Sequence, residues 1–325
     1  MVQEDCLISS SSFDLSLNSD APLNKVVVVL GPTASGKSSL AVEIALKFGG
    51  EIVSADSVSV YKGLDIGSAK PSADEMKGVP HHLIDVVSPK SSFSVGDYEE
   101  LALPVINDIV KRGRLPIICG GTGFYINSVL YKMSYGLSKG NPEIRGKYEM
   151  LATESGRESV YAVLKEKDPE TAEKLHPNDL VRVIRALEIF EGTGVKKSEI
   201  KDEMKPRFDF VALFPSMPRE ILYERINSRV NDMLSRGLEN EVRGLLNGGV
   251  TLSDQCMQGI GYKEVAEALT NDEEISAELI KMNTRRYAKR QITFFKRFSN
   301  IEYIDMTKSD AYEKSFKIVY NFLNF

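Results

Sequence analysis

The stretch from residue 26 to residue 38 constrains the fold more than any other. It opens with five consecutive apolar residues, Val26–Leu30, four of which are β-branched. Such a run is typical of a strand that is buried on both faces. The next eight residues, Gly31–Ser38, match the pattern G-x-x-x-x-G-K-[ST]. In that pattern, backbone N–H groups at a helix N-terminus bind phosphate oxygens. The stretch therefore predicts a diphosphate site in an α/β fold, without saying whose diphosphate it binds.

We expect the whole loop to contact the diphosphate, with the last two residues in distinct roles. The lysine of such a loop reaches the distal phosphate oxygens, and the hydroxyl that follows it ligates Mg²⁺. A helix should continue from Ser39, with Leu40, Ile44 and Leu46 facing the sheet. The predicted diphosphate contacts are Gly31, Pro32, Thr33, Ala34, Ser35, Gly36, Lys37 and Ser38, with Ser38 also the metal ligand.

Composition excludes several classes of protein. The 325 residues carry a net charge of −5, so nucleic-acid binding would have to rest on local basic patches. Cys6, Cys119 and Cys256 are scattered and offer neither metal-ligand spacing nor a disulfide framework, which suits the reducing cytoplasm. No apolar stretch approaches the roughly 20 residues of a membrane span. Residues 1–24 are Ser-rich, acidic and aperiodic, and we expect a disordered tail there.

A second buried strand is predicted over residues 51–55, and Asp56 follows it directly. Ligands of open α/β sheets lie at the carboxyl ends of the strands, so Asp56 should lie near the phosphate loop. A carboxylate there can act as a general base, cap a turn, or take part in a Mg²⁺ shell. The residues alone favour none of these roles strongly over the others.

A third buried strand over residues 115–119 ends in Gly120, Gly121 and Thr122. A kinase or ATPase of the Walker type usually places its Mg²⁺-binding Asp after such a strand. Two glycines and a threonine offer close backbone approach and a hydroxyl instead. This departure argues against ordinary ATP hydrolysis.

The character of the chain changes over residues 138–204, where strand-like runs disappear and charged helical segments follow one another. We therefore expect three parts: residues 25–137 as the first part of the α/β core, 138–204 as a helical insertion, and 205–325 as the second part of the core. Arg182 and Arg185 are three residues apart and share one helix face. Without further evidence, a solvated charged face is the default interpretation of that pair.

Two basic features follow the insertion. Arg225 and Arg229 are one helical turn apart and are candidates to close over a diphosphate. The stretch Lys281–Arg297 holds seven basic residues and no acidic one, with Arg285 and Lys289 on one helix face and Arg286 and Arg290 on the adjacent face. Like charges at that spacing repel, so an anionic partner such as an RNA backbone is favoured. The alternative is pairing with the acidic neighbours Glu273, Glu274 and Glu278.

Taken in order, these motifs resemble one known family. They are Gly31–Ser38, Ser54–Ser57, Asp65–Pro71, Pro80–Asp85, Gly120–Thr122, His176–Asp179, Arg182–Glu188, Gly259–Tyr262 and Arg285–Arg290. The chain is similar to the bacterial tRNA dimethylallyltransferases over about residues 25–306. The resemblance implies a P-loop NTPase-like parallel sheet core with an inserted all-helical tRNA-binding domain.

The resemblance also implies the reaction, which is transfer of a dimethylallyl group from dimethylallyl diphosphate to N6 of the adenine 3′-adjacent to a tRNA anticodon. Mg²⁺ would assist the diphosphate, and a cytoplasmic monomer is expected. Asp56 would take the N6 proton, and Thr122 would lie beside the target adenine. The implied contacts with the anticodon stem-loop are Asp56, Ser57, Val58, Ser59, Thr122, Arg145, Val181, Arg182, Val183, Ile184, Arg185, Arg285, Arg286, Lys289 and Arg290.

Three other functions remain open from the residues: a free-nucleotide isopentenyltransferase, a small-molecule kinase and a noncatalytic nucleotide-binding module. A free-nucleotide isopentenyltransferase would share the core but would need no insertion to grip tRNA. A small-molecule kinase would bind ATP at Gly31–Ser38.

Overall fold

The computed structural model describes residues 24–133, 140–200, 204–298 and 300–324. The disordered tail predicted for residues 1–24 therefore lies outside the described residues, except for Asn24. The carbonyl of Asn24 accepts a hydrogen bond from the N–H of Asp209 at 3.0 Å, which places the start of the described chain beside the central sheet.

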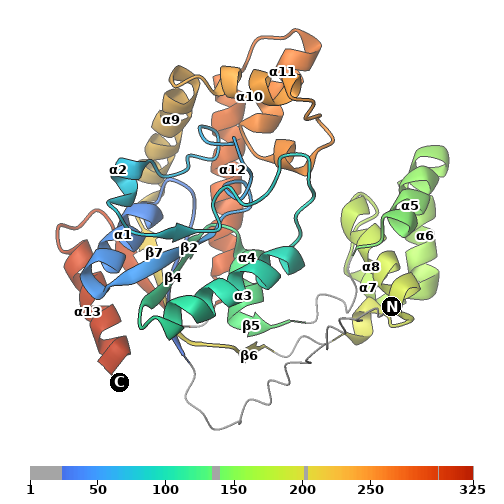
Figure 1. The fold of residues 1–325 in the computed structure, drawn as a ribbon. Coiled ribbons are helices and arrows are strands. Elements are labelled where there is room, and N and C mark those ends of the chain that lie inside the picture. The colour runs from blue at the N-terminus through green and yellow to red at the C-terminus, as the bar shows by residue number, and fades with distance from the viewer. Residues whose placement is uncertain (1–23, 134–139, 201–203, 299, 325) are drawn as a thin grey trace, which may run out of the picture.

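The centre of the fold is a parallel sheet of six strands (Figure 1). In spatial order the strands are β3 (His81–His82), β2 (Gly50–Ala55), β4 (Leu115–Gly120), β1 (Lys25–Leu30), β7 (Asp209–Ser216) and β8 (Ile301–Asp305). Every neighbouring pair in this order is parallel. The three strands predicted from apolar runs are all present, and the α/β class with a P-loop-like core is confirmed.

Both faces of β1 are covered, which explains its unbroken apolar run. Val26, Val28 and Leu30 belong to a core that includes α3 (Val95–Lys111), α4 (Gly123–Leu130) and α12 (Ala277–Phe295). Val27 and Val29 face the opposite way, into a core with α1 (Lys37–Phe48) and α13 (Ala311–Asn324). Alternate side chains of a strand point to opposite faces, so a sheet between two helical layers needs apolar residues at every position.

One detail of α1 differs from the prediction. Leu40 and Ile44 are fully buried against the sheet, as expected, but the side chain of Leu46 is 51% exposed. At about 100° per residue, Leu46 lies some 200° around the helix from Ile44 and therefore faces away from the sheet.

Helices α9 (Arg219–Ser235), α10 (Leu238–Asn247), α11 (Tyr262–Asn271) and α12 gather at one end of the sheet (Figure 1). A short 3₁₀ helix at Gln255–Gln258 lies just before α11. The long connection after β2 also contributes a single helical turn, α2 (Ala73–Met76). These segments cover the end of the sheet that carries the phosphate loop.

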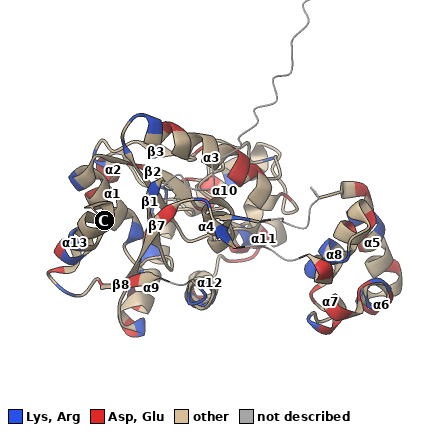
Figure 2. Cartoon of the chain, turned by 90° about the horizontal axis from the view of Figure 1, so that it is seen from below, with Lys and Arg blue, Asp and Glu red and all other residues tan. Residues whose placement is uncertain are grey.

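The helical insertion leaves and re-enters the core through a pair of short antiparallel strands. They are β5 (Tyr131–Lys132) and β6 (Lys205–Pro206). Between them lie α5 (Pro142–Ser155), α6 (Arg157–Lys167), α7 (Pro169–Glu173), α8 (Leu180–Thr193) and a 3₁₀ turn at Lys197–Glu199. Helices α5–α8 stand to one side of the sheet in Figures 1 and 2 and enclose a core of their own, including Tyr148, Leu164 and Leu187. The division of the chain at residues 138 and 204 stays a prediction.

Candidate active site at the phosphate loop

The phosphate loop begins where β1 ends and finishes at the N-terminus of α1. Gly36 adopts φ 89°, a left-handed conformation that favours glycine, directly before the first helical residue, Lys37. The ammonium of Lys37 folds back over the loop and donates to the carbonyl oxygen of Pro32 at 2.6 Å. The pKa of Lys37 is lowered to about 8, chiefly by burial. The nearby charge of Arg229 acts in the same direction, while Cys119 and Asp56 oppose it. The lysine is therefore a cation held in the loop at neutral pH, close to losing its proton.

Asp56 follows β2, and its two carboxylate oxygens have different surroundings. Its Oδ1 accepts the backbone N–H groups of Val58 at 2.9 Å and Ser59 at 3.1 Å, which caps the turn after the strand. Its Oδ2 accepts no hydrogen bond from any residue that the structure describes, and the side chain lines a cavity beside the phosphate loop. The capping role and the role of a base are therefore compatible, because they use different oxygens.

Thr122 lies beside Asp56 through a contact between the two loops. Its Oγ1 accepts the N–H of Ser57 at 3.0 Å and lies 3.3 Å from Ser57 Oγ. Its own N–H donates to the carbonyl of Ala55 at 3.1 Å. The glycine before this loop permits the close approach, since a Cβ on Gly120 would lie 2.1 Å from Ala55 O. The ends of β2 and β4 are thereby locked together.

A cavity of about 430 Å³ opens between the sheet and the helices of its carboxyl end. It joins the phosphate loop to Asp56, to the basic helix α12 and to α9. Its lining includes Thr33, Lys37, Ser38, Asp56, Ser57, Val58, Ser59, Gly121, Arg229, Tyr287, Arg290 and Gln291. Thr122 does not line the cavity itself and reaches it through Ser57.

A second, smaller cavity of about 270 Å³ also borders the phosphate loop. Five residues line both cavities: Lys37, Ser38, Ala69, Pro71 and Arg229. Arg225 and Arg236 line only the smaller of the two cavities. The structure thus brings both predicted arginines of α9 beside the phosphate loop, which concentrates positive charge there.

Two site residues on α12 escaped the sequence analysis. Oε1 of Gln291 accepts the N–H of Thr33 at 2.9 Å, and its Nε2 donates to the carbonyl of Gly121 at 3.0 Å. Tyr287, one turn earlier, lines the cavity, and burial together with the charge of Asp56 raises its pKa to about 12. Both residues lie inside the basic run. Their sequence signal is that each is an uncharged polar residue on the side of the helix that faces the core.

The basic residues of α12 divide into two groups. Lys281 pairs with Glu278 at 2.9 Å, and Arg285 donates to Asn227 Oδ1 at 2.6 Å. Arg286, Lys289 and Arg290 are exposed and form no ion pair with any described residue. Pairing with acidic neighbours therefore accounts for Lys281 alone. The guanidinium of Arg290 lies over the ring of Tyr287, 5.7 Å from its centroid, at the cavity wall.

In the insertion, the predicted arginine contacts differ in their acidic partners, one of which is buried. Arg145 and Arg185 both reach Oε2 of Glu188, at 3.1 and 3.4 Å, and Glu188 is almost fully buried. Arg182 is exposed and pairs with Asp179 at 3.1 Å. Figure 2 shows acidic and basic residues interspersed along these helices.

The apolar members of that stretch differ in exposure. Val181 is 74% exposed, but Val183 and Ile184 are buried in the core of α5–α8. The side chains of Val183 and Ile184 are therefore covered by the helical core, and RNA contact along this stretch stays a prediction. Val183 lies about 200° around the helix from Val181 and so faces the opposite side, and Ile184 flanks the buried stripe formed by Val183 and Leu187.

Comparison with known proteins decides the family. The model of the IPP transferase family matches residues 59–298. The chain belongs to this family. Curated relatives include the tRNA dimethylallyltransferase of Caldanaerobacter subterraneus subsp. tengcongensis, which is 45% identical over 92% of this chain and 97% of its own. That of Bacillus cytotoxicus is 47% identical over 88% of this chain and 92% of its own.

Solved structures of the family share the fold. The tRNA isopentenylpyrophosphate transferase of Bacillus halodurans has a TM-score of 0.68 and 39% identity, covering 93% of this chain and 96% of its own. A eukaryotic dimethylallyltransferase acting on tRNA has a TM-score of 0.81 and 32% identity, covering 93% of this chain and 80% of its own. No helix in the described part of the chain is long and apolar enough to cross a membrane.

Proposed function

We propose that this protein transfers a dimethylallyl group from dimethylallyl diphosphate to N6 of the adenine 3′-adjacent to the anticodon of a tRNA, in the cytoplasm. The observation that carries the proposal is the single cavity that joins Lys37 and Arg229 to Asp56 and to the basic helix α12. The cavity offers a diphosphate site at one end and a carboxylate facing the same space. Membership of the IPP transferase family supports this assignment.

The reaction requires one bond to form and one to break. The N6 nitrogen attacks C1 of the dimethylallyl group, the C1–O bond breaks, and diphosphate leaves with the electron pair. The nitrogen then gives up a proton, for which we assign Oδ2 of Asp56, the oxygen that the turn does not use. The lone pair of an adenine amino group is delocalised into the ring, so a base that removes the proton assists the attack.

We assign the leaving diphosphate to the phosphate loop. The N–H groups of Gly36, Lys37 and Ser38 at the start of α1, the ammonium of Lys37 and the guanidinium groups of Arg225 and Arg229 would take up the charge that develops on it. Ser38 is exposed at the start of α1 and lines both cavities, so its hydroxyl fits the role of a Mg²⁺ ligand. Bound there, Mg²⁺ would neutralise diphosphate charge, with water and phosphate oxygens completing its shell.

We assign the tRNA backbone to two surfaces. The first is the exposed basic face of α12, formed by Arg286, Lys289 and Arg290, which lacks acidic partners among the described residues. The second is the insertion, through the exposed Val181 and Arg182. The adenine would have to leave the stack of its loop to reach the cavity, as bases do in other enzymes that modify them.

The test is incubation with labelled dimethylallyl diphosphate and tRNA, AMP or ATP in separate reactions. Label on tRNA alone, located to the adenine after the anticodon by nuclease mapping, is the expected result. Label on AMP or ATP would instead establish a free-nucleotide isopentenyltransferase, and no transfer to any acceptor would refute the assignment.

A further inference from the structure

The loop over residues 64–71 forms a wall of both cavities. Gly67, Ser68, Ala69 and Pro71 line the larger one, and Ala69, Lys70 and Pro71 line the smaller. The loop turns tightly, with Ala69 at φ 48° and the N–H of Lys70 bonded to the carbonyl of Asp65 at 3.1 Å. Before substrate binds, the conformation of this loop depends on its contacts with the rest of the protein, outside the cavity.

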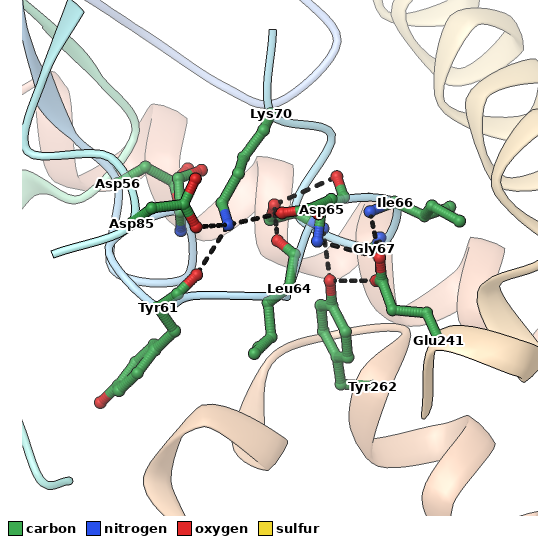
Figure 3. Close-up of polar contacts among 12 residues, drawn as sticks. Asp56, Tyr61, Leu64, Asp65, Ile66, Gly67, Lys70, Asp85, Glu241 and Tyr262 are labelled. Carbon is green, nitrogen blue, oxygen red and sulfur yellow. Dashed lines mark hydrogen bonds and ion pairs between the residues drawn. The ribbon is translucent and has the colours of Figure 1, made fainter. Parts of the chain in front are cut away.

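Glu241, on α10, holds three consecutive backbone groups of this loop (Figure 3). Its Oε2 accepts the N–H of Asp65 at 3.0 Å and of Ile66 at 2.8 Å, and its Oε1 accepts the N–H of Gly67 at 3.2 Å. Hydrogen bonds to an ionised acceptor are about twice as strong as neutral ones. One side chain thus fixes the direction of three peptide groups.

Tyr262, on α11, completes the attachment. Its hydroxyl donates to Oε1 of Glu241 at 2.6 Å and accepts the N–H of Ser68 at 3.1 Å. Its ring packs flush against Gly67, where an added Cβ would lie 2.6 Å from Cε2. The four backbone N–H groups from Asp65 to Ser68 therefore all donate to this Glu241–Tyr262 pair.

The ammonium of Lys70, the lysine of this loop, is bonded to other groups of the protein. Lys70 Nζ donates to Tyr61 O at 2.7 Å, Asp65 Oδ1 at 2.7 Å and Asp85 Oδ1 at 2.5 Å, and the side chain is 7% exposed. Figure 3 shows these bonds on the side of the loop away from Glu241. The ammonium of Lys70 already has three acceptors, so the cation that this loop directs toward the cavities is a different one.

That cation is Arg229. Its Nη2 lies 3.4 Å from the carbonyl oxygen of Ser68, the residue whose N–H is bonded to Tyr262. The Ser68 carbonyl shares a planar peptide with the N–H of Ala69, which donates to the carbonyl of Ile66 at 3.0 Å. The Ile66 carbonyl in turn shares a peptide with the N–H of Gly67, which Glu241 holds. Arg229 lines both cavities beside Lys37.

We propose that Glu241 and Tyr262 are positioning residues for diphosphate binding, acting through the 64–71 loop on the guanidinium of Arg229. This inference rests on the proposed function. Neither residue lines either of the two cavities beside the phosphate loop, so neither is placed to touch the substrate directly. Their effect should fall on the diphosphate substrate and spare the RNA.

The experiment compares Glu241→Gln and Tyr262→Phe with Glu239→Gln in the full-length protein. Glu239 lies on the same helix and pairs only with exposed Arg243, at 2.8 Å, so it is the matched control. We expect KM for dimethylallyl diphosphate to rise about tenfold in the first two variants, the scale of one lost charge-assisted hydrogen bond. KM for tRNA should stay within twofold, as should both constants of Glu239→Gln.

A purely structural role predicts another pattern. Partial unfolding would lower the active fraction, so kcat would fall while both KM values stayed unchanged. That result would overturn the proposal, and so would wild-type kinetics in Glu241→Gln. An inactive wild-type protein would instead count against the proposed function.

A double-mutant cycle tests the path through Arg229. In an Arg229→Ala background, Glu241→Gln should change the dissociation constant of inorganic diphosphate by less than twofold, because the group it positions is already gone. An equal factor in both backgrounds would show that Glu241 acts independently of Arg229 and would refute the path.

Discussion

Oε1 of Gln291 accepts a hydrogen bond from the backbone N–H of Thr33, at 2.9 Å, across 258 positions of the chain. The same amide donates to Gly121 O, so the helix that carries the basic face also joins the phosphate loop to the end of β4. Helix α12 is therefore part of the cavity wall as well as the surface that we propose for RNA, and its two faces can be tested separately.

Gln291→Leu keeps the volume of the side chain but leaves the N–H of Thr33 and the carbonyl of Gly121 without partners. Each unsatisfied buried group costs about 1–3 kcal/mol. We expect urea unfolding to show a loss of free energy in that range and kcat/KM for dimethylallyl diphosphate to fall. Thr293→Ala, at an exposed site on the same helix, is the control and should change neither quantity. Wild-type values for Gln291→Leu would contradict the role of this bridge.

The pKa of Lys37, lowered to about 8 by burial, predicts how diphosphate binding depends on pH. The protonated ammonium binds phosphate, so affinity should be full below that pKa and should fall as pH rises through it. Calorimetric titration with inorganic diphosphate from about pH 7 to 9 measures this. Lys37→Arg keeps its charge throughout and corrects for titration of the ligand. Parallel pH profiles for the two proteins would exclude Lys37 as the titrating group.

Asp56→Asn should separate the two oxygens of this side chain. Asparagine can still present an acceptor to Val58 and Ser59, so the turn and the tRNA affinity should survive. It cannot accept a proton from N6, and single-turnover rates should fall by about 10²–10⁴. If Asp56 instead serves a Mg²⁺ shell, excess Mg²⁺ should restore the rate. Rescue across a Mg²⁺ series would mean that another group is the base.

Gly120→Ala tests the close approach of β4 to β2. The added Cβ would lie 2.1 Å from Ala55 O, a backbone atom, so the strands must separate and the free energy of unfolding should drop by more than about 2 kcal/mol. Gly244→Ala, in α10, meets nothing within 4 Å and should be neutral or raise stability by about 0.5–1 kcal/mol. Thermal unfolding of both variants measures the contrast, and equal melting temperatures would contradict the packing.

Arg286 and Lys289 offer a test of RNA binding that spares the cavity. Each replacement by alanine should weaken tRNA binding and lower the slope of log affinity against log salt by about one unit. Lys317→Ala, at an exposed site on α13, which packs on the other face of the sheet from α12, is the control. A full salt titration with an unchanged slope would assign these charges to the protein's own surface.

The fold was predictable where local pattern carries the information. A run of valines buried on both faces, followed by a glycine-rich loop, specifies strand, loop and helix without reference to distant residues. Asp56 and the Gly120–Thr122 segment could be placed near the loop because parallel strands end at a common edge.

The rest of the site depends on tertiary contacts that no local pattern encodes. Gln291 and Glu241 bind backbone N–H groups 258 and up to 176 positions away, and any polar residue at those helix positions would look the same in sequence. The side chains of Val183 and Ile184 are buried because a helix alternates buried and exposed positions. A continuous run of residues, such as Val181–Arg185, therefore cannot present every side chain on one surface.

The pairing of β5 with β6 has a consequence for how such a protein can diverge. The chain departs at Tyr131 and returns at Pro206, and these two residues are partners in the same short ladder. Helices grafted on such a stem, with their own core, can lengthen or shorten by whole turns while every strand of the sheet keeps its register. Natural variation can therefore remodel how far along an RNA the protein reaches while the reacting groups stay where they are.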